Sequence, residues 1–299
     1  MTQGLSRSQP RQSHGHRDSK GKSTRAAAVS TLAPLTIIVA CFLVLPILGM
    51  AYTSFRTSSG DGFTLENYAA LAEGNRGLAL KNSLIVSGLS ALIATVVGLV
   101  VAAAISTVRS TTVDAITGII SSVLANSGGA PLAFSFIVLL GNTGYLIDAV
   151  TAVDGDFSLY SLRGLVIMYQ YFLIPTMVLL TLPSFRALRT SWREANTSLG
   201  GSAWTFWRRV GMPILAPTVL GAAIMLFGAA FATHASAAVL MGTGSFPLVT
   251  LQIANELSGS AASGGRTVAM AMGMVTAVVA VVTLVAFTWL QNRSRRWQL

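Results

Sequence analysis

The chain has 299 residues, of which 53% are hydrophobic and only 10% are charged, whereas charged residues make up roughly 25% of an ordinary soluble domain. Lys and Arg total 20 and Asp and Glu total 10, and the net charge of +10 admits either nucleic acid or an anionic membrane surface as a partner. This composition excludes an ordinary soluble enzyme, and the single cysteine, Cys41, excludes an intramolecular disulfide framework and a cysteine-based metal site.

Six apolar segments are long enough to cross a membrane, which takes about 20 residues of helix. They are residues 31–54, 83–108, 115–146, 164–182, 214–241 and 268–290. None contains Asp, Glu, Lys or Arg, as expected when each charge costs about 2.5–3.5 kcal/mol at the bilayer centre. The sequence therefore predicts an all-α, polytopic membrane protein with six transmembrane helices.

The basic residues indicate the orientation of these helices. An even number of spans places both termini on one side, and fifteen of the twenty basic residues fall on that side. They are Arg7, Arg11, Arg17, Lys20, Lys22, Arg25, Arg109, Arg186, Arg189, Arg193, Arg208, Arg209, Arg293, Arg295 and Arg296; Arg56, Arg76, Lys81, Arg163 and Arg266 fall on the other. Cytoplasmic loops carry the excess of Lys and Arg, so we expect both termini in the cytoplasm. The positive charge is then mostly an orientation signal, and no nucleic-acid partner is expected.

The expected organisation follows the chain from end to end. Residues 1–28 are polar and basic and predict a disordered cytoplasmic tail. Residues 29–54 form an additional N-terminal span, because the apolar run is longer than the 7–15 residues of a signal-peptide core and lacks a convincing cleavage site. An extracytoplasmic loop occupies residues 55–81, the main membrane domain residues 82–291, and a basic cytoplasmic tail residues 292–299.

The longest cytoplasmic connection, residues 184–213, predicts two short helices. Ser191 and Glu194 have the spacing of a capping box, and Gly200-Gly201 allows a left-handed stop and a sharp turn. Ser202 can cap a second helix, which Gly211-Met-Pro213 would end. The aromatic residues and arginines of this loop suit either a protein interface or an amphipathic helix pair on the bilayer surface.

The same loop resembles the EAA loop of binding-protein-dependent ABC importer permeases, whose transmembrane domains have the MetI-like fold. The pattern is Glu-Ala-Ala, three residues, Gly, nine residues, then Ile-x-Leu-Pro. Glu194 and Ala195 match it, Asn196 replaces the second alanine, Gly200 follows three residues later, and Val210-Gly-Met-Pro213 occupies the last place. The likeness extends to the six-span layout over most of residues 81–297, and it favours the protein-interface interpretation of the loop.

The resemblance implies a non-catalytic permease of the bacterial inner membrane, in which this loop docks on a cytoplasmic ATPase. The residues expected to shape or flank that contact are Arg193, Glu194, Ala195, Gly200, Arg208, Arg209 and Pro213. The expected partners are an ATPase dimer, a second permease subunit that we expect to be a different chain, an extracytoplasmic solute-binding protein and membrane lipids. The ATPase would bind ATP and Mg²⁺, and this chain would hold no cofactor and no metal.

A translocation pathway requires polar or irregular backbone at membrane depth. Two glycines and a proline in Asn126-Ser-Gly-Gly-Ala-Pro131 interrupt the third apolar segment, although a proline kink relieved by neighbouring helices would have the same pattern. His234 lies within the fifth predicted span, either as a packing residue or facing the pathway. The candidate pathway residues are Asn126, Ser127, Gly128, Tyr169, Gln170 and His234.

Cargo and mechanism class remain open at this stage. The segments Phe63-Thr-Leu-Glu-Asn-Tyr68 and Ser127-Gly-Gly-Ala-Pro-Leu132 resemble the spermidine/putrescine branch of the permeases, which implies a polyamine-like cation. Iron, thiamine, sulfate and phosphonate are the alternatives. A secondary transporter or channel is a different-class alternative, but His234 is the one residue that the predicted spans offer for ion coupling.

Overall fold

The computed structural model describes residues 33–59, 61–108, 110–242, 246–259 and 265–295. The chain divides into two compact units, residues 1–50 and residues 51–299. The predicted tail 1–28, Arg109 and the last residues of the predicted tail 292–299 lie outside the described residues.

The first unit is described from Ala33 onwards and is helical. The helix begins at Ala33, contains a π-helical turn, η1 (Ala40–Val44), and continues as α2 (Leu45–Ser54) to its end in the second unit. Its apolar side chains are exposed, and the exposed fraction of Phe42 is 80%. This helix coincides with the predicted span 31–54.

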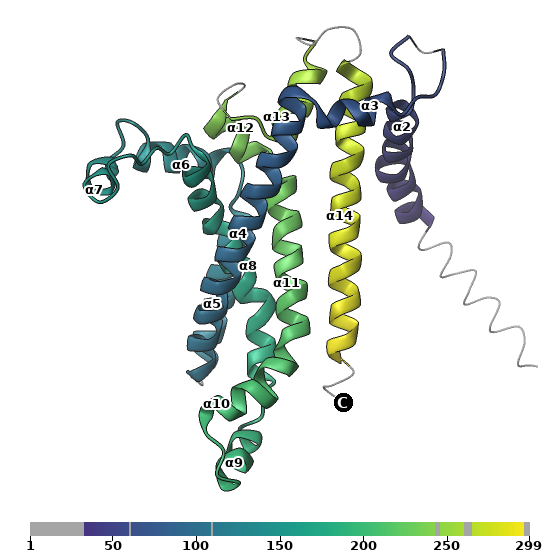
Figure 1. The fold of residues 1–299 in the computed structure, drawn as a ribbon. Coiled ribbons are helices and arrows are strands. Elements are labelled where there is room, and N and C mark those ends of the chain that lie inside the picture. The colour runs from purple at the N-terminus through teal and green to yellow at the C-terminus, as the bar shows by residue number, and fades with distance from the viewer. Residues whose placement is uncertain (1–32, 60, 109, 243–245, 260–264, 296–299) are drawn as a thin grey trace, which may run out of the picture. The chain divides into compact units, whose positions relative to one another are not determined.

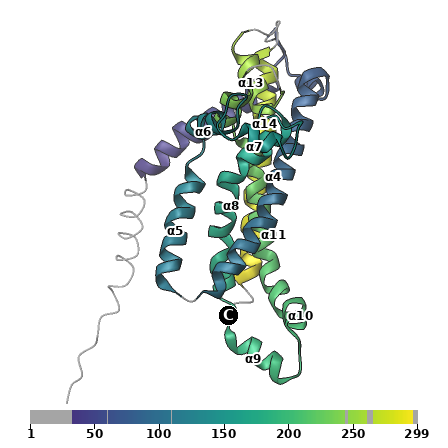
Figure 2. The same ribbon diagram turned by 90° about the vertical axis from the view of Figure 1, so that its left-hand side faces the viewer.

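Long helices form the body of the second unit (Figures 1 and 2). They are α4 (Gly74–Thr107), α5 (Thr111–Asn126), α8 (Leu162–Arg186), α11 (Met212–Ala232) and α14 (Gly265–Arg295). Shorter elements connect them: α3 (Glu66–Ala69), the 3₁₀ turn η2 (Ala70–Ala72), α6 (Ala130–Leu140), α7 (Ile147–Thr151), α9 (Thr190–Ser198), α10 (Ala203–Phe206), the π-helical turn η3 (Trp207–Gly211), α12 (Ala235–Met241) and α13 (Val249–Leu257). Among the described residues no strand occurs, and five helices, or six with a bent pair, are long and apolar enough to span a membrane.

Small residues bring the long helices close together. Helix α4 packs against α8, and α11 packs against α4, α8 and α14. A Cβ atom added at Gly98 would lie 2.6 Å from the Cβ of Met177 in α8, and one added at Gly228 would lie 2.6 Å from the Thr283 hydroxyl in α14. Close backbone approach through small residues is the usual basis of helix association in lipid.

The second unit has two ends (Figure 1), and the residues at these ends differ in charge. Helices α9 and α10 lie at one end, which we call the hairpin end, together with the last residues of α4 and the first residues of α5. The described basic residues there are Arg186, Arg189, Arg193, Arg208 and Arg209. The opposite end carries α3, α6, α7 and α13 and most of the acidic residues: Asp61, Glu66, Glu73, Asp148, Asp154, Asp156 and Glu256. The basic residues therefore lie at the two ends as the sequence predicts. Which side of the membrane each end faces stays a prediction.

The third apolar segment is broken where the sequence predicts an interruption. Helix α5 ends at Asn126, and α6 begins at Ala130 at an angle of 93° to it. Gly129 has φ of +90°, a conformation that L side chains rarely adopt, and Pro131 occupies the first turn of α6, where no N–H is needed. The predicted span 115–146 is therefore a bent helix pair that is broken at the predicted interruption, and whether the pair crosses the membrane as one span stays a prediction.

Two other boundaries differ from the prediction. Helix α11 ends at Ala232 because Thr233 leaves the helical region, with φ −68° and ψ 123°, so the predicted span 214–241 is divided into α11 and the short α12. Helix α4 begins at Gly74, so its first two turns and α3 lie in the stretch predicted as the loop 55–81.

The residues that suggested a polyamine-type branch have a structural role at the opposite end. Arg56 and Phe63 form an isolated antiparallel bridge. The buried Asn67 amide donates to the carbonyls of Ser54 and Arg56, both at 2.8 Å, and accepts from the Thr267 hydroxyl at 3.1 Å. Asn67 thus fastens this loop to α14.

Glycines in α4 provide a test of the helix packing. Gly98→Ala should lower the Tm of the detergent-purified protein, because the new methyl group must displace Met177 and overpacking costs about 1–3 kcal/mol. Gly88→Ala in the same helix meets no atom within 4 Å and should raise Tm slightly, since alanine is favoured over glycine in a helix by about 1 kcal/mol. Equal shifts for the two variants would contradict the close packing.

Candidate functional site: the α9–α10 hairpin

The two short helices α9 and α10 are joined by a tight turn. Gly200 has φ of +75° and donates its N–H to the Thr197 carbonyl at 2.9 Å. The Ser202 hydroxyl accepts from the Thr205 N–H at 3.2 Å and caps α10. The sequence prediction of a glycine stop followed by a serine cap is confirmed.

Asn196, the residue that departs from the EAA pattern, holds this turn. The side-chain amide of Asn196 donates to the carbonyls of Gly201 at 3.0 Å and Ser202 at 3.1 Å. The main-chain carbonyl of Asn196 accepts from the Gly201 N–H at 2.8 Å. A Cβ atom at Gly201 would lie 2.3 Å from the Asn196 side-chain oxygen. The Asn196 side chain therefore links the two helices across the turn, and it leaves no room for a side chain at position 201.

The predicted capping box is wrong. Helix α9 begins at Thr190 with Arg189 as N-cap and without a side-chain capping bond, so Ser191 lies within the first turn. Glu194 is exposed, and among the described residues its side chain forms no hydrogen bond or ion pair. Its carboxylate is free to contact a partner.

The predicted end of the second helix at Gly211 and Pro213 is also wrong. The chain continues from α10 through the π-helical turn η3 into α11, and the helix Ala203–Ala232 is continuous over 30 residues. Proline lacks an N–H and clashes with the carbonyl four residues before it. The wider π-helical turn just before Pro213 relieves that clash, which explains how the helix passes through the proline.

Aromatic residues attach the hairpin to the end of α8. Phe206 is 2% exposed, and the Trp207 ring lies 6.2 Å from that of Phe185. The Arg193 guanidinium stacks at 5.3 Å from the Phe206 centroid and 5.6 Å from the Trp207 centroid. Arg193 therefore contacts two aromatic rings of the hairpin, where a cation–π contact stabilises by about 0.5–1 kcal/mol, and its role beside a docking contact stays a prediction.

The outer surface of the hairpin is exposed and hollowed. Leu199 is 88% exposed and Trp204 70%. A hollow of about 700 Å³ is lined by Trp192, Ala195, Asn196, Leu199, Gly200, Gly201, Thr205, Arg209, Val210 and Ile214. All seven predicted docking residues are exposed: Arg193, Glu194, Ala195, Gly200, Arg208, Arg209 and Pro213. We call this exposed face of α9, α10 and η3 the hairpin face.

The sequence did not single out several residues of this site. Leu199 and Trp192 line the hollow, and an exposed leucine directly before a glycine turn was an available signal. Arg186 is the last residue of α8 and bonds to α4 and α5. A basic residue in the last turn of a helix commonly bonds to the terminal carbonyls, so the position of Arg186 at the end of a predicted span was an available signal for such a contact.

The candidate pathway residues lie in three places. Asn126 and Ser127 bond back to the Ser122 and Val123 carbonyls of their own helix, at 2.8 and 2.6 Å. Gly128, between α5 and α6, is exposed. Within the described part of the chain, the Asn126 and Ser127 side chains form no hydrogen bond to α8 or α12.

Tyr169 and Gln170 lie in the packed body of α8. Tyr169 is 2% exposed and borders a very small hollow with Ser83, Ser87, Thr233 and Thr250. The Gln170 amide donates to the Val166 carbonyl at 2.9 Å, and its buried side-chain oxygen has no partner among the residues that the structure describes. Tyr169 thus faces polar side chains but no open cavity in this conformation.

His234 is not inside a span. It is the N-cap of α12, in the break after α11, and its side chain is exposed. The expectation of a histidine within the fifth span was wrong because the helix stops two residues earlier. Among the described residues, no group of three or more His, Cys, Asp or Glu could hold a metal ion.

Two curated relatives resemble most of the chain in sequence. The ferric transport system permease protein FbpB of Actinobacillus pleuropneumoniae is 24% identical over 272 residues, covering 89% of this chain and 38% of the relative. A ferric transport permease, FbpB 1, of Haemophilus influenzae is 23% identical over 272 residues, covering 89% and 42%. The chain thus spans about two fifths of the length of the relatives that it matches. No family model matches it.

Solved structures resemble the whole fold. A chain of a bacterial ABC transporter involved in the import of the acidic polysaccharide alginate superposes with a TM-score of 0.67 at 19% identity, covering 93% of this chain and 98% of the other. The fold is that of an ABC importer transmembrane domain. A bacterial alginate ABC transporter in complex with an alginate pentasaccharide-bound periplasmic protein gives a TM-score of 0.64 at 18% identity, with coverage of 93% and 97%.

These likenesses correct the expected branch. The relatives are named for ferric transport and the structures for alginate, so they support the ABC importer permease resemblance and not the spermidine/putrescine branch. The role of Asn67 in fastening the loop to α14 accounts for part of the motif that suggested that branch.

The turn of the hairpin can be tested by a double-mutant cycle. Gly201→Ala should destabilise the hairpin because its methyl group overlaps Asn196, and Asn196→Ala should do so through the loss of two hydrogen bonds, each contributing about 0.5–1.5 kcal/mol. The double variant should lose less than the sum, since the overlap disappears with the asparagine. Amide hydrogen exchange across residues 190–206 measures the effect, and additive losses would contradict the described contact.

Proposed function

We propose that this chain is a permease subunit of an ATP-driven ABC importer of the bacterial inner membrane. It would form half of the translocation pathway and carry no catalytic site, with ATP hydrolysis on a partner ATPase. The fold and the relatives support this role, and the hairpin face is the observation that carries it.

The hairpin face has the properties of a docking surface. It combines an exposed leucine and tryptophan, Leu199 and Trp204, with a hollow of about 700 Å³, and such apolar anchors carry most of the binding energy at protein interfaces. Glu194, Arg208 and Arg209 provide exposed charges of both signs around it. Because η3 joins this face to α11 without a break, a partner that moves the hairpin would also move a spanning helix.

The proposed assembly has a definite set of partners. Two ATPase subunits would dock on the hairpin faces of this chain and of a second permease subunit, which we infer to be a related but different chain. An extracytoplasmic solute-binding protein would deliver the cargo at the opposite end. Both termini would lie in the cytoplasm, because the hairpin end carries the described arginines of the connecting loops.

We infer that ferric iron is the cargo, which the names of the two relatives support. The proposed pathway runs past the break between α5 and α6, with Asn126, Ser127 and Gly128, and past His234 at the break after α11. Tyr169 and Gln170 would reach it only when α8 and α11 separate, because both are packed in the described conformation.

Docking on the hairpin face can be tested by charge reversal. Glu194→Arg should reduce the amount of ATPase that co-purifies with the permease at least about tenfold, equivalent to about 1.4 kcal/mol, because it reverses an exposed charge on the contact. The protein should still insert, since Glu194 makes no contact that stabilises the fold. Asp156→Arg, an exposed acid at the opposite end, is the matched control and should retain the ATPase. Normal co-purification with Glu194→Arg would refute the docking surface.

The cargo is tested by uptake in iron-limited cells. Deletion of this chain should abolish ATP-dependent uptake of radiolabelled ferric citrate, and excess spermidine should not compete in the parent strain. Unchanged iron uptake together with loss of polyamine, thiamine, sulfate or phosphonate uptake would reject iron as the cargo while leaving the permease role in place.

A further inference from the structure

We propose that Arg186 and Asp114 form a clamp that makes the hairpin end move as one body, so that displacement of the hairpin is passed to α4 and α5 as well as to α11. This inference rests on the proposed permease function. It assigns Arg186 and Asp114 as positioning residues, neither of which touches the proposed ATPase contact.

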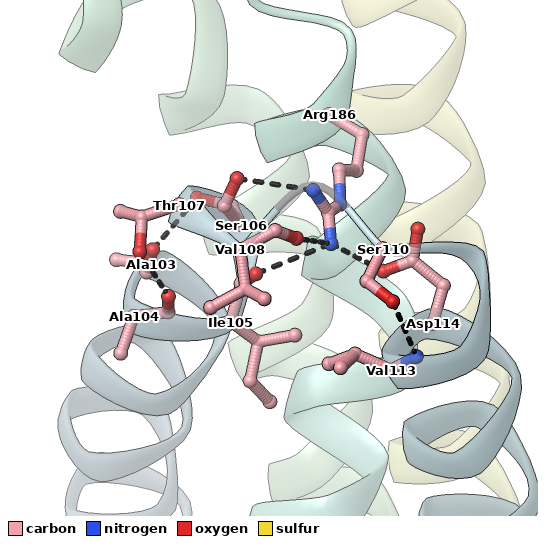
Figure 3. Close-up of polar contacts among 10 residues, drawn as sticks. All are labelled: Ala103, Ala104, Ile105, Ser106, Thr107, Val108, Ser110, Val113, Asp114 and Arg186. Atoms are coloured by element: carbon pink, nitrogen blue, oxygen red, sulfur yellow. Dashed lines mark hydrogen bonds and ion pairs between the residues drawn. The ribbon is translucent and has the colours of Figure 1, made fainter.

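One guanidinium group joins three helices (Figure 3). Arg186 is the last residue of α8, and its Nη1 donates to the Ser106 carbonyl at 3.1 Å. Its Nη2 donates to the carbonyls of Ile105 at 3.1 Å and Val108 at 2.8 Å, and forms an ion pair with Asp114 in the first turn of α5. The bonds therefore link the end of α8 to the end of α4 and the start of α5.

The chemistry of this contact favours arginine. The last carbonyls of a helix have no partner within it and carry partial negative charge, and those of α4 converge on the flat, forked guanidinium (Figure 3). The Asp114 carboxylate lies at the N-terminal end of α5, where negative charge is favoured. Lysine would keep the charge but could not hold several acceptors in this planar arrangement.

A hollow lies beside the clamp, at the end of α4 and the α8–α9 corner. Its volume is about 450 Å³, and it is lined by Ser106, Thr107, Phe185, Arg186, Leu188, Arg189, Thr190 and Arg193. Next to it, apolar side chains of α4, α8 and the hairpin pack together, with Ala102 and Phe185 in a buried cluster that Trp207 also contacts. The hydrogen bonds of Arg186 add a polar link to this apolar contact, three residues before Arg189, the N-cap of α9.

Solvent exposure separates this role from a purely stabilising one. The Arg186 and Asp114 side chains are 24% and 44% exposed, and ion pairs open to water add little to folding stability. Among the described residues, the buried Nε atom of Arg186 has no hydrogen-bond partner, so the guanidinium retains a donor that another arrangement of the hairpin could satisfy. The ion pair with Asp114 therefore serves mainly to hold positions, while the bonds to the carbonyls also stabilise the hairpin end.

Spin labels on α4 and α9 test the clamp in the permease purified with its co-purifying ATPase. Cysteines are placed at the exposed positions Ala104 and Ser198, with Cys41→Ser as background. With the clamp intact, the distance distribution between the labels should be the same without nucleotide and with ATP and vanadate. With Arg186→Lys the distribution should shift or broaden on trapping, because the hairpin then moves without α4.

Transport provides the second readout. Arg186→Lys should raise the number of ATP molecules hydrolysed per imported ferric ion about fivefold or more. Fivefold is the lower end of the effects by which one site typically changes another. Asp114→Asn, which retains the carbonyl bonds of Arg186, should change both readouts in the same direction but less. Arg163→Lys is the matched control, because Arg163 pairs with Asp154 in another exposed ion pair at the opposite end, and it should leave both readouts unchanged.

The outcomes separate the clamp from the proposed function. Wild-type distances and wild-type ATP use in an assembled Arg186→Lys complex would overturn the clamp and leave the permease role intact. Failure of both clamp variants to assemble would assign the contact to stability and also overturn the inference. Failure of the wild-type chain itself to co-purify with an ATPase would overturn the permease role, and the clamp with it.

Discussion

Close approach of helix backbones is the constraint on which the rest of the second unit depends. The hydrophobic effect drives the folding of soluble proteins, but within a membrane it does not bring helices together. Helix packing there relies on small residues and on polar groups that are hydrogen-bonded within the protein. Gly98 allows α4 to contact Met177 of α8, Gly228 allows α11 to contact Thr283 of α14, and Gly221 brings α11 within reach of Phe287. These contacts place α11 between α4, α8 and α14, and the position of α11 in turn determines where the hairpin and the break at His234 lie.

Features governed by hydropathy and by single special residues could be predicted from the sequence. The spans were predictable because a charge in lipid is costly, and the break after Asn126 was predictable because glycine and proline cannot continue a helix at low cost. The turn at Gly200 and the cap at Ser202 follow from the same local chemistry. Each of these signals depends on a few neighbouring residues and not on the tertiary structure.

Features decided by tertiary context could not be predicted in this way. Pro213 ordinarily indicates a helix start or stop, but the π-helical turn before it lets the helix continue. The spacing of Ser191 and Glu194 is that of a capping box, yet the N-cap of α9 is Arg189, two residues before Ser191, so the hydroxyl lies within the helix. The end of α11 at Ala232 has no sequence signal, since Thr233 and His234 are compatible with a helix. The bonds of Arg186 join residues about 80 positions apart, and no local pattern reports them.

The continuity of α10, η3 and α11 has a mechanical consequence. A helix of 30 residues, Ala203–Ala232, is roughly 45 Å long at 1.5 Å per residue, so a tilt of about 5° about its hairpin end displaces its far end by about 4 Å. That far end is followed at once by Thr233 and His234. The backbone break at Thr233 and His234 is thus the place where a small tilt at the hairpin end gives the largest displacement of this helix.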